Sequence, residues 1–415
     1  MDVVTPIGIG LESYWRAVLA GTSGVRRISD FDPSGLPTQI AACVPEPLQT
    51  LRQSMGLKDE EPRSVVFALL AASGAVRHAG GVELLRTGRA GVYVGTSGER
   101  IDLRQFGKIG YTVRESGKGI CRDRFSREYV RVFAAKRLYR TFPQFLASRV
   151  AEEFGIVGPG ATIQTACTSS AQAIGAALRA IRRGDLEIAL AIGAECIVSP
   201  IEVQLFCLLG VLSKKNEAPE ISSRPFDALR DGFVLGEGAG VLVLEELEQA
   251  LRRGAPILAE LAGYGTSCDA YRITDEAPDG RGAILAISRA LADGQMEAND
   301  IEYVNAHGTS TLMNDRVETA AIKAVFRSHA RALAVSSTKS MIGHTISAAG
   351  AIELITTALA LRDQVIPPTM NYEVPDPDCD LDYVPNSPRA ASLRAAISNS
   401  FGFGGHNDCL LVRKL

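Results

Sequence analysis

Short apolar runs rich in β-branched residues alternate along this chain with longer runs that repeat apolar residues at helical spacing. Eight of the short runs predict strands, at residues 90–97, 161–166, 187–195, 238–247, 301–307, 331–337, 394–400 and 409–415. Helices are predicted between them, for example over 170–183, where Gly184 marks the end, and over 280–294. Buried strands that alternate with helices are typical of an α/β fold with largely parallel sheets.

Three segments depart from this alternation. Residues 1–10 hold turn residues directly before a helix expected over 11–20, so we expect the opening strand of the fold to be missing, as in a chain that lacks its first residues. A hinge near 250–256 separates two halves with similar patterns, although residue identities show no repeat. The segment 99–140 holds twelve lysines and arginines against five acidic residues, and a basic helix is expected over 124–140.

Composition narrows the possible partners and the cellular setting. The net charge of -3 gives no reason to expect nucleic acid, and the chain has no apolar run of about 18 residues that could cross a membrane. Eight scattered cysteines without a CxxC pair argue against a disulfide framework and against a zinc site. We therefore expect a cytoplasmic protein without a nucleic-acid or membrane partner.

Cys167 lies in the stretch TIQTACTSSAQ, between a predicted strand and a predicted helix. The N–H groups and the dipole at a helix N-terminus favour an anion, so a thiol at this position is expected to have a lowered pKa and to act as a nucleophile. Free cysteines are also among the most buried residue types. The local pattern therefore leaves a structural cysteine and a catalytic one both open.

Two of the five histidines follow predicted strands in turns rich in glycine and threonine. They are His307, in NAHGTST, and His344, in KSMIGH, which Lys339 precedes by five residues. The carboxyl ends of parallel strands are where α/β proteins place their sites, although a histidine there can also be structural. A loop over 399–407, NSFGFGGHN, lacks phosphate-loop spacing but has the glycines to expose backbone N–H groups.

The motifs TACTSS, VNAHGTST, SSTKSMIGH and NSFGFGGHN, in this order, resemble the elongating β-ketoacyl-(acyl carrier protein) synthases, the discrete type II ketosynthases of the thiolase superfamily. Residues 222–274 and 366–385 extend the resemblance. It implies a thiolase-like duplicated core, with two βαβαβαββ halves in five α-β-α-β-α layers. Residues 1–250 would hold Cys167, and residues 251–415 the histidines, Lys339 and the glycine loop. It also implies an acyl carrier protein as partner, and a homodimer or a heterodimer with a paralogous subunit.

The resemblance also implies a decarboxylative Claisen condensation. Cys167 would carry the acyl group as a thioester, with the N–H groups of Cys167 and Phe403 as oxyanion hole. Malonyl-carrier protein would then lose CO₂, with His307 and His344 stabilising the enolate. Lys339 and Glu353 match a buried charge pair that would orient His344.

Other positions match substrate-binding residues of the family. Thr309 and Thr311, and more weakly Thr274, match contacts to the phosphopantetheine arm of the carrier protein. Phe403 matches a gating ring, with Phe401 beside it. The residues that would line the acyl pocket are Gln204, Leu205, Phe206, Cys207 and Leu208. Their volume and polarity indicate specificity for an unusual or shorter acyl chain. We therefore expect a specialised pathway, fatty-acid-like or polyketide.

Some matches concern groups that we do not expect here, or expect in altered form. Asn305, Glu353 and Ser398 fall where relatives sometimes hold a monovalent cation, but we expect no metal and no cofactor, since the phosphopantetheine belongs to the carrier protein. Gly210 stands where fatty-acid enzymes often have an arginine that meets the carrier protein. The basic segment 99–140 either reshapes that docking region or is a solvated helix.

Two other functions compete with the condensing enzyme. A partner subunit that determines chain length in a ketosynthase heterodimer usually lacks the cysteine, so Cys167 together with His307 and His344 argues against it. A thiolase would need a second catalytic cysteine near the C-terminus. Cys409 lies inside a predicted strand and is expected to belong to the core.

Overall fold

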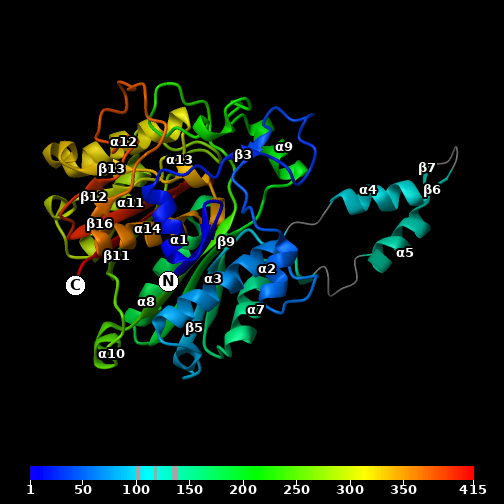
Figure 1. Ribbon diagram of the computed structural model, residues 1–415, viewed down its shortest axis with the longest axis horizontal. Helices are drawn as coiled ribbons and strands as arrows, with labels where there is room; N and C mark the ends of the chain where they lie inside the picture. The colour runs from blue at the N-terminus through cyan, green and yellow to red at the C-terminus, as the bar shows by residue number, and fades with distance from the viewer. Residues whose placement is uncertain (100–102, 116–118, 133–138) are drawn as a thin grey trace.

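Two mixed sheets form the centre of the protein (Figure 1). The computed structural model describes residues 1–99, 103–115, 119–132 and 139–415. The first sheet has the order β2-β1-β10-β9-β5-β8, with strands β1 Asp2–Thr5, β2 Gly8–Ile9, β5 Ala90–Gly95, β8 Gly160–Ile163, β9 Ile188–Glu195 and β10 Gly238–Glu245. The second has the order β11-β17-β16-β12-β13, with strands β11 Glu260–Cys268, β12 Tyr303–Asn305, β13 Ala334–Ser336, β16 Ala395–Gly402 and β17 His406–Arg413.

The two sheets repeat one topology. Apart from β2, the pairs run antiparallel, antiparallel, parallel and parallel in β1-β10-β9-β5-β8 and again in β11-β17-β16-β12-β13. This is the duplication that residue identities did not reveal. In each of these five-strand orders one strand, β10 or β17, runs opposite to the other four, so the strands are largely parallel as expected, apart from β10, β17 and β2. In the second sheet, β17 follows β16 through a tight turn, and a tight turn joins antiparallel strands.

Helices complete five layers, α-β-α-β-α, as the resemblance implied. α3 and α7 pack on the outer face of the first sheet, α8 and α14 lie between the sheets, and α11 and α12 cover the second sheet. The bounds of the helices are α1 Leu11–Leu19, α2 Leu48–Ser54, α3 Arg63–Ala79, α4 Leu103–Thr112, α5 Arg122–Val132, α7 Gln144–Phe154, α8 Ser169–Arg182, α9 Pro200–Leu209, α10 Leu247–Arg252, α11 Arg281–Asp293, α12 Leu312–Phe326, α13 Lys339–Ile342 and α14 Ala349–Asp363.

The central helices α8 and α14 approach each other closely because their residues are small. Every residue of α14 from Ala349 to Leu361 is buried, so no face of this helix needs polar residues. A Cβ atom added at Gly350 would lie 2.9 Å from both the Cβ atom and the backbone nitrogen of Ala171 in α8. Glycine is therefore required at this crossing, and the first turns of both helices are held together.

The first residues of the chain form a strand, β1, although no strand was predicted there. Asp2 and Val4 of β1 pair antiparallel with Val241 and Ala239 of β10. Four residues are too few for a recognisable alternation. The pairing stops at Val241, and beyond it a cavity of about 640 Å³ with a largely apolar lining runs along the rest of β10. The helix expected over 11–20 is α1.

Strand β11 was also missed by the sequence pattern. Its segment, ELAGYGTSC, contains two glycines and few β-branched residues. Cβ atoms at Gly263 and Gly265 would lie 2.3 and 2.0 Å from backbone oxygens of α11. The glycines thus let α11 lie directly on the strand, and this close packing replaces the usual apolar pattern.

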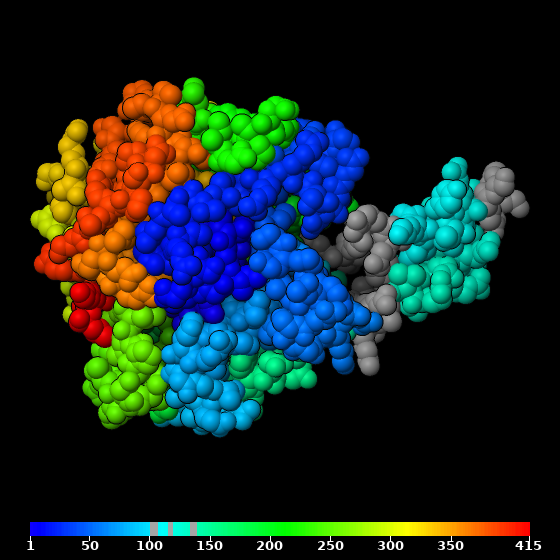
Figure 2. Space-filling model, in the orientation of Figure 1, coloured from blue at the N-terminus to red at the C-terminus, as the bar shows by residue number. Residues whose placement is uncertain are grey.

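The segment between β5 and α7 forms a helical hairpin that projects from the body (Figures 1 and 2). It consists of α4, the short strands β6 Arg114–Glu115 and β7 Gly119–Ile120, and α5. We call it the arm, residues 103–115 and 119–132. Ile109 and Val113 are buried within it, against aromatic and aliphatic side chains of α5. The basic helix expected over 124–140 begins at Arg122, and the part over 133–138 lies outside the described residues.

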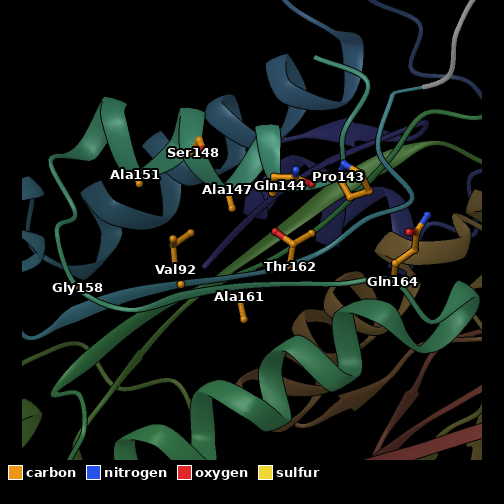
Figure 3. A pocket seen from close by; sticks show the side chains of 11 residues that line it. Val92, Pro143, Gln144, Ala147, Ser148, Ala151, Gly158, Ala161, Thr162 and Gln164 are labelled. Atoms are coloured by element: carbon orange, nitrogen blue, oxygen red, sulfur yellow. The ribbon is translucent and has the colours of Figure 1, made fainter. Parts of the chain in front are cut away.

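The sheet edge next to the arm is open. Among the described residues, β8 pairs with β5 alone, and the residues of β8 are half-buried or exposed. A hollow of about 660 Å³ lies between β8 and α7, with Gln144 and Ala147 of the helix above Thr162 of the strand (Figure 3). None of the helices in the described part of the chain has the length and apolar character that a membrane span requires. The remaining strand pairs are peripheral: β3 Arg26–Arg27 with β4 Ile40–Ala41, and β14 Val365–Ile366 with β15 Arg389–Ala390.

Candidate active site

Cys167 lies in a single 3₁₀ turn, Ala166–Thr168, between β8 and α8. Ala166 has a φ of 51°, which is unusual for a residue with a side chain and is typical of strained functional turns. The hydroxyl of Ser169 holds the turn, because it accepts from Thr165 N at 2.9 Å and donates to Ala166 O at 2.7 Å. The turn thus fixes Cys167 at the start of α8, 5% exposed.

The two predicted histidines meet at this cysteine. His344 Nε2 lies 3.1 Å from Cys167 Sγ, and the ring centroids of His307 and His344 are 5.2 Å apart. One nitrogen of each ring and the sulfur all lie within 4.8 Å of one another. Cys167 comes from the first sheet's side, and both histidines come from the second. The site is therefore built at the seam between the two halves.

Backbone and lysine contacts fix the tautomers of both histidines. Lys339 Nζ lies 3.3 Å from His307 Nδ1, and an ammonium group only donates, so Nδ1 accepts and the hydrogen is on Nε2. Ile346 N donates to His344 Nδ1 at 3.2 Å, with the same consequence. Burial, together with the charge of Lys339, lowers the pKa of both rings well below the usual histidine value. Both are neutral and offer an Nε2–H donor.

These tautomers make the cluster a poor metal site. A cysteine and two histidines are a suitable donor set for zinc. A metal needs a nitrogen lone pair, however, and here the Nδ1 lone pairs are taken by Lys339 and Ile346 while Nε2 carries hydrogen. The arrangement is suited instead to binding a negatively charged oxygen.

The pKa of Cys167 is shifted in the direction opposite to that predicted from its place at a helix N-terminus. Burial raises the pKa of the thiol to about 12, and Lys339 and the backbone N–H groups of Phe403 and Cys167 only partly offset this. The prediction of a lowered pKa is therefore wrong, because loss of hydration outweighs the nearby positive groups. These are the two N–H groups that the resemblance assigns to the oxyanion hole.

Lys339 and Glu353 form a fully buried ion pair, as the resemblance implied. Burial raises the pKa of Glu353 to about 7, against the opposing effect of Lys339. Lys339 also donates to His307 O at 2.7 Å. The expectation that the pair orients His344 is wrong: it contacts His307, while His344 is oriented by the backbone of Ile346.

Glu318, a residue that sequence reasoning missed, holds the other side of the His307 turn. Its carboxylate accepts from His307 N at 2.9 Å and from Gly308 N at 2.7 Å. Burial raises its pKa to about 7. The available signal was an acidic residue on the buried side of the helix that follows the HGTST motif, here α12.

The glycine loop brings the two predicted phenylalanines to different positions. Phe401 is buried at the end of β16, with its ring centroid 5.8 Å from that of His307. Phe403 is half-buried in the turn that follows. Gly404 N donates to Ile273 O at 2.6 Å, so this turn is tied to the segment that carries Thr274, which is exposed.

Thr309 and Thr311 lie beside His307, with their hydroxyl oxygens 2.9 Å apart. Thr309 is buried and Thr311 is half-buried at the first turn of α12, where its hydroxyl accepts from Asn314 N at 3.3 Å. The structure thus brings these two threonines together near the site, and Thr274 lies on the adjoining loop.

The residues predicted to line the acyl pocket divide between two faces of α9. Phe206 and Cys207 pack against the apolar cluster around Cys167, whereas Leu205 and Leu208 are 53% and 73% exposed and Gln204 is half-buried. The ring of Phe233 lies between Phe206 and His344, at centroid distances of 5.8 and 5.3 Å. The buried members of this cluster are Ile28, Ala41, Cys167, Ile197, Val203, Leu212, Phe233, Leu235 and Ile346.

Three buried oxygens behind the site have no hydrogen-bond partner among the described residues: Asn305 Oδ1, Glu353 Oε2 and Ser398 Oγ. Asn305 and Ser398 are direct neighbours across β12 and β16. Unpaired buried oxygens are rare, and such a group commonly binds water or an ion. Oxygens of this kind are suitable ligands for a monovalent cation, which the resemblance associates with these three positions.

Family comparisons agree with this geometry. The description "Beta-ketoacyl synthase, N-terminal domain" matches residues 1–250, and "Beta-ketoacyl synthase, C-terminal domain" matches residues 258–373. A polyketide beta-ketoacyl synthase of Streptomyces halstedii is 43% identical over 420 residues, which cover 99% of this chain and 96% of the relative. A 3-oxoacyl-(acyl-carrier-protein) synthase 2 of Synechocystis sp. is 40% identical over 417 residues, which cover 100% and 96%.

Solved structures are similar over the whole chain. A ketosynthase of a type II polyketide synthase, in complex with its acyl-carrier protein and bound to a hexaketide, has a TM-score of 0.88 at 33% identity, covering 100% of this chain and 97% of its own. The ishigamide ketosynthase/chain length factor has a TM-score of 0.86 at 33% identity, with the same coverage.

Proposed function

Because this chain belongs to the β-ketoacyl synthase family, we propose that it is a discrete elongating ketosynthase, an acyltransferase that joins an acyl group to malonyl-carrier protein. The observation that carries the proposal is the meeting of a buried thiol with two Nε2–H donors. Cys167 would be the nucleophile, and His307 and His344 would be the donors to a developing enolate.

In the first half-reaction, Cys167 Sγ attacks the carbonyl carbon of an acyl-carrier thioester. The N–H groups of Cys167 and Phe403 stabilise the resulting oxyanion, and one such donor is typically worth about 10²–10³ in rate. The carbon–sulfur bond to the pantetheine then breaks, and the proton of Cys167 leaves with the departing thiol. The acyl group remains as a thioester on the enzyme.

In the second half-reaction, malonyl-carrier protein loses CO₂, and the electron pair moves into an enolate whose oxygen accepts from His307 and His344 Nε2–H. The enolate carbon attacks the acyl carbonyl, a carbon–carbon bond forms, and Cys167 leaves as a thiolate that takes up a proton. Lys339 holds His307 in the required tautomer. Departure of CO₂ drives the reaction, which needs neither a cofactor nor a metal at the reacting atoms.

The proposed partners are an acyl carrier protein, which brings the phosphopantetheine arm, and a second subunit, either identical or paralogous. The open edge of β8 and the hollow beside it provide a surface for the second subunit, and the exposed Tyr111 and Val130 of the arm provide more. A partner subunit that determines chain length stays the alternative function. The retention of Cys167 and both histidines is the argument against it.

The proposed pathway is a specialised one, fatty-acid-like or polyketide, in the cytoplasm. Phe206 and Phe233 fill much of the apolar cluster around Cys167, which favours a short acyl group. The polyketide relative from Streptomyces supports this direction, and the free state of all eight cysteines is compatible with a reducing compartment.

Intact-mass measurement tests the proposal. The protein is incubated with a panel of acyl-carrier proteins, alongside Cys167→Ala. We expect an acyl mass on the natural protein and none on the variant, and then release of a β-ketoacyl product when malonyl-carrier protein is added. Absence of an adduct from every donor would reject the condensing-enzyme function, and an adduct that persists with malonyl-carrier protein would favour the partner-subunit alternative.

A further inference from the structure

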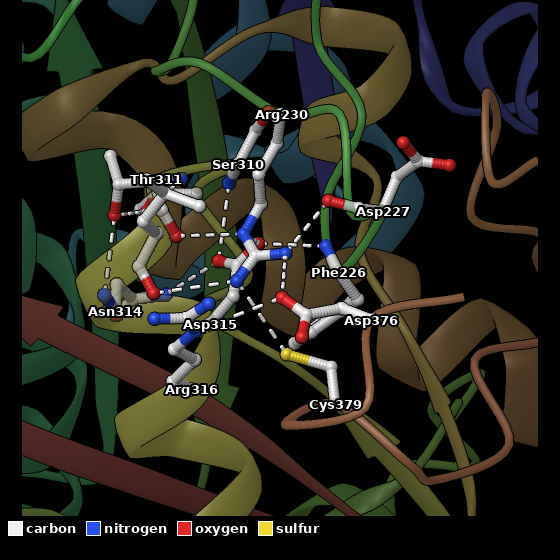
Figure 4. A network of polar contacts seen from close by, with 12 residues as sticks. Phe226, Asp227, Arg230, Ser310, Thr311, Asn314, Asp315, Arg316, Asp376 and Cys379 are labelled. Atoms are coloured by element: carbon white, nitrogen blue, oxygen red, sulfur yellow. Dashed lines mark hydrogen bonds and ion pairs between the residues drawn. The ribbon is translucent and has the colours of Figure 1, made fainter. Parts of the chain in front are cut away.

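Arg230 is an arginine with no exposed side-chain surface, and its guanidinium group contacts two other segments of the chain, residues 311–315 and 376–379 (Figure 4). It forms ion pairs with Asp315 at 3.2 Å and with Asp376 at 2.7 Å. It also donates to the backbone oxygen of Thr311 at 3.1 Å and of Leu312 at 3.4 Å. The planar five-donor fork of arginine suits this many acceptors, and the single ammonium of lysine does not.

Asp315 extends the same network to the residues on either side of the site. Its carboxylate accepts from Ser310 N at 3.2 Å and from Phe226 N at 2.7 Å. Ser310 and Phe226 have φ angles of 73° and 66°, a region that favours glycine. Two strained residues held by one carboxylate indicate that the surrounding network fixes this backbone.

The segment so fixed is Thr309–Thr311, directly after His307. The hydroxyls of Thr309 and Thr311 contact each other, and Ser310 Oγ accepts from Arg224 N at 3.0 Å. The side chain of Arg230 contacts this segment through the Thr311 carbonyl. The backbone that carries both hydroxyls is therefore held in part by a guanidinium group that is itself buried.

We propose that Arg230 is a positioning residue that, with Asp315 and Asp376, aims the hydroxyls of Thr309 and Thr311 at the phosphopantetheine arm of the incoming carrier protein. The inference rests on the proposed function. It assigns binding of the phosphopantetheine arm, and not the chemistry at Cys167, to a buried ion network. A purely structural network would instead change stability alone.

The test compares Arg230→Lys, which keeps the charge but loses the fork, with Asp376→Asn, which removes one ion pair at lower risk to folding. KM and kcat are measured with acyl- and malonyl-carrier protein. Cys167 is separately alkylated with iodoacetamide, a reagent that has no phosphopantetheine group. We expect KM to rise about tenfold or more in Arg230→Lys, since a hydrogen bond to a charged group is worth about that factor. We expect kcat to change less than about threefold and the alkylation rate to be unchanged.

Arg316→Gln is the matched control. Arg316 is half-exposed and approaches the same Asp376 at 3.7 Å, and Asp378 at 3.1 Å, from the outer side. We expect the KM, kcat and alkylation rate of this variant to equal those of the natural protein. That result would show that loss of the exposed ion pair between Arg316 and Asp376 does not reproduce the effect of Arg230→Lys.

The outcomes separate this inference from the proposed function. A fall in melting temperature with unchanged KM, in both Arg230→Lys and Asp376→Asn, would overturn the positioning role. An equal loss of kcat and of alkylation would also overturn it, because the network would then act on Cys167. No acyl adduct on the natural protein would instead reject the ketosynthase function itself.

Discussion

The thiol of Cys167 is surrounded by groups that act on it in opposite directions. Lys339 and two backbone N–H groups favour the thiolate, and burial disfavours it by more. The resting enzyme therefore carries a thiol, and the site stabilises negative charge only where it forms during reaction. This protects the cysteine from unspecific chemistry without removing its catalytic use.

This balance predicts the pH dependence of Cys167 alkylation. Because the pKa is raised to about 12, the thiolate fraction grows about tenfold per pH unit from pH 7 to 10 and does not level off. The rate of modification by iodoacetamide, followed by mass spectrometry of the Cys167 peptide, should rise in the same way. Cys167→Ala gives the background from the other cysteines, and a plateau near pH 8 would contradict the expected pKa.

The residues proposed to carry the chemistry could be found from the sequence because they follow strands in distinctive motifs. Cys167, His307 and His344 needed only the alternation of strands and helices and the order of the motifs. The pKa of Cys167 could not be found in this way, because it depends on burial by segments far away in the chain. Glu318 and Arg230 were missed for a similar reason, since each acts through backbone groups that only folding brings near.

At the level of strands and helices, β12, β16 and α14 each carry a residue with a buried oxygen that is unpaired among the described residues: Asn305, Ser398 and Glu353. A monovalent cation there would link the two strands to the helix that carries the partner of Lys339. We expect melting to occur at higher temperature in potassium or sodium chloride than in choline chloride of equal ionic strength. The gain is about 1.4 kcal/mol when the ion is present at about ten times its Kd.

Ser398→Ala provides the control for this ion effect. The variant loses one of the three oxygens, so its melting temperature should depend less on the cation. If the natural protein melts at the same temperature in all three salts, water and not an ion occupies the position.

The elements themselves were predicted with uneven success. Strands such as β9 and β10 are recognisable in the sequence as largely apolar runs of eight residues. By contrast, β1 is too short to show a pattern, and β11 contains glycines where β-branched residues would be expected. The antiparallel direction of β17 was also not predicted, since strand direction follows from connections and not from the alternation of side chains.

The arm projects from the five-layer body, so the molecule as a whole is not compact (Figure 2). Arg122, Arg124 and Arg127 are exposed residues of α5, within a segment rich in positive charge. An acyl carrier protein would meet such a surface through its acidic groups. Electrostatic contacts of this kind mainly accelerate association and weaken as salt is added.

Replacing these three arginines by glutamate should therefore weaken binding of the carrier protein at low salt, with a smaller difference at high salt. Titration at two or more ionic strengths, for example by calorimetry, measures this. Alkylation of Cys167 by iodoacetamide should stay unchanged, because the arm projects away from the body. Equal affinities at low salt would show that the arm is a solvated helix with no part in docking.

The crossing of α8 and α14 at Gly350 and Ala171 has a consequence for how the protein loses its activity. Each of these helices begins at the active site, and each lies between both sheets, so neither half keeps its own hydrophobic core when the other unfolds. The chain should then behave as one cooperative unit despite its internal repetition. Activity and secondary structure should disappear at the same urea concentration, and a half expressed alone should yield no partially active fragment.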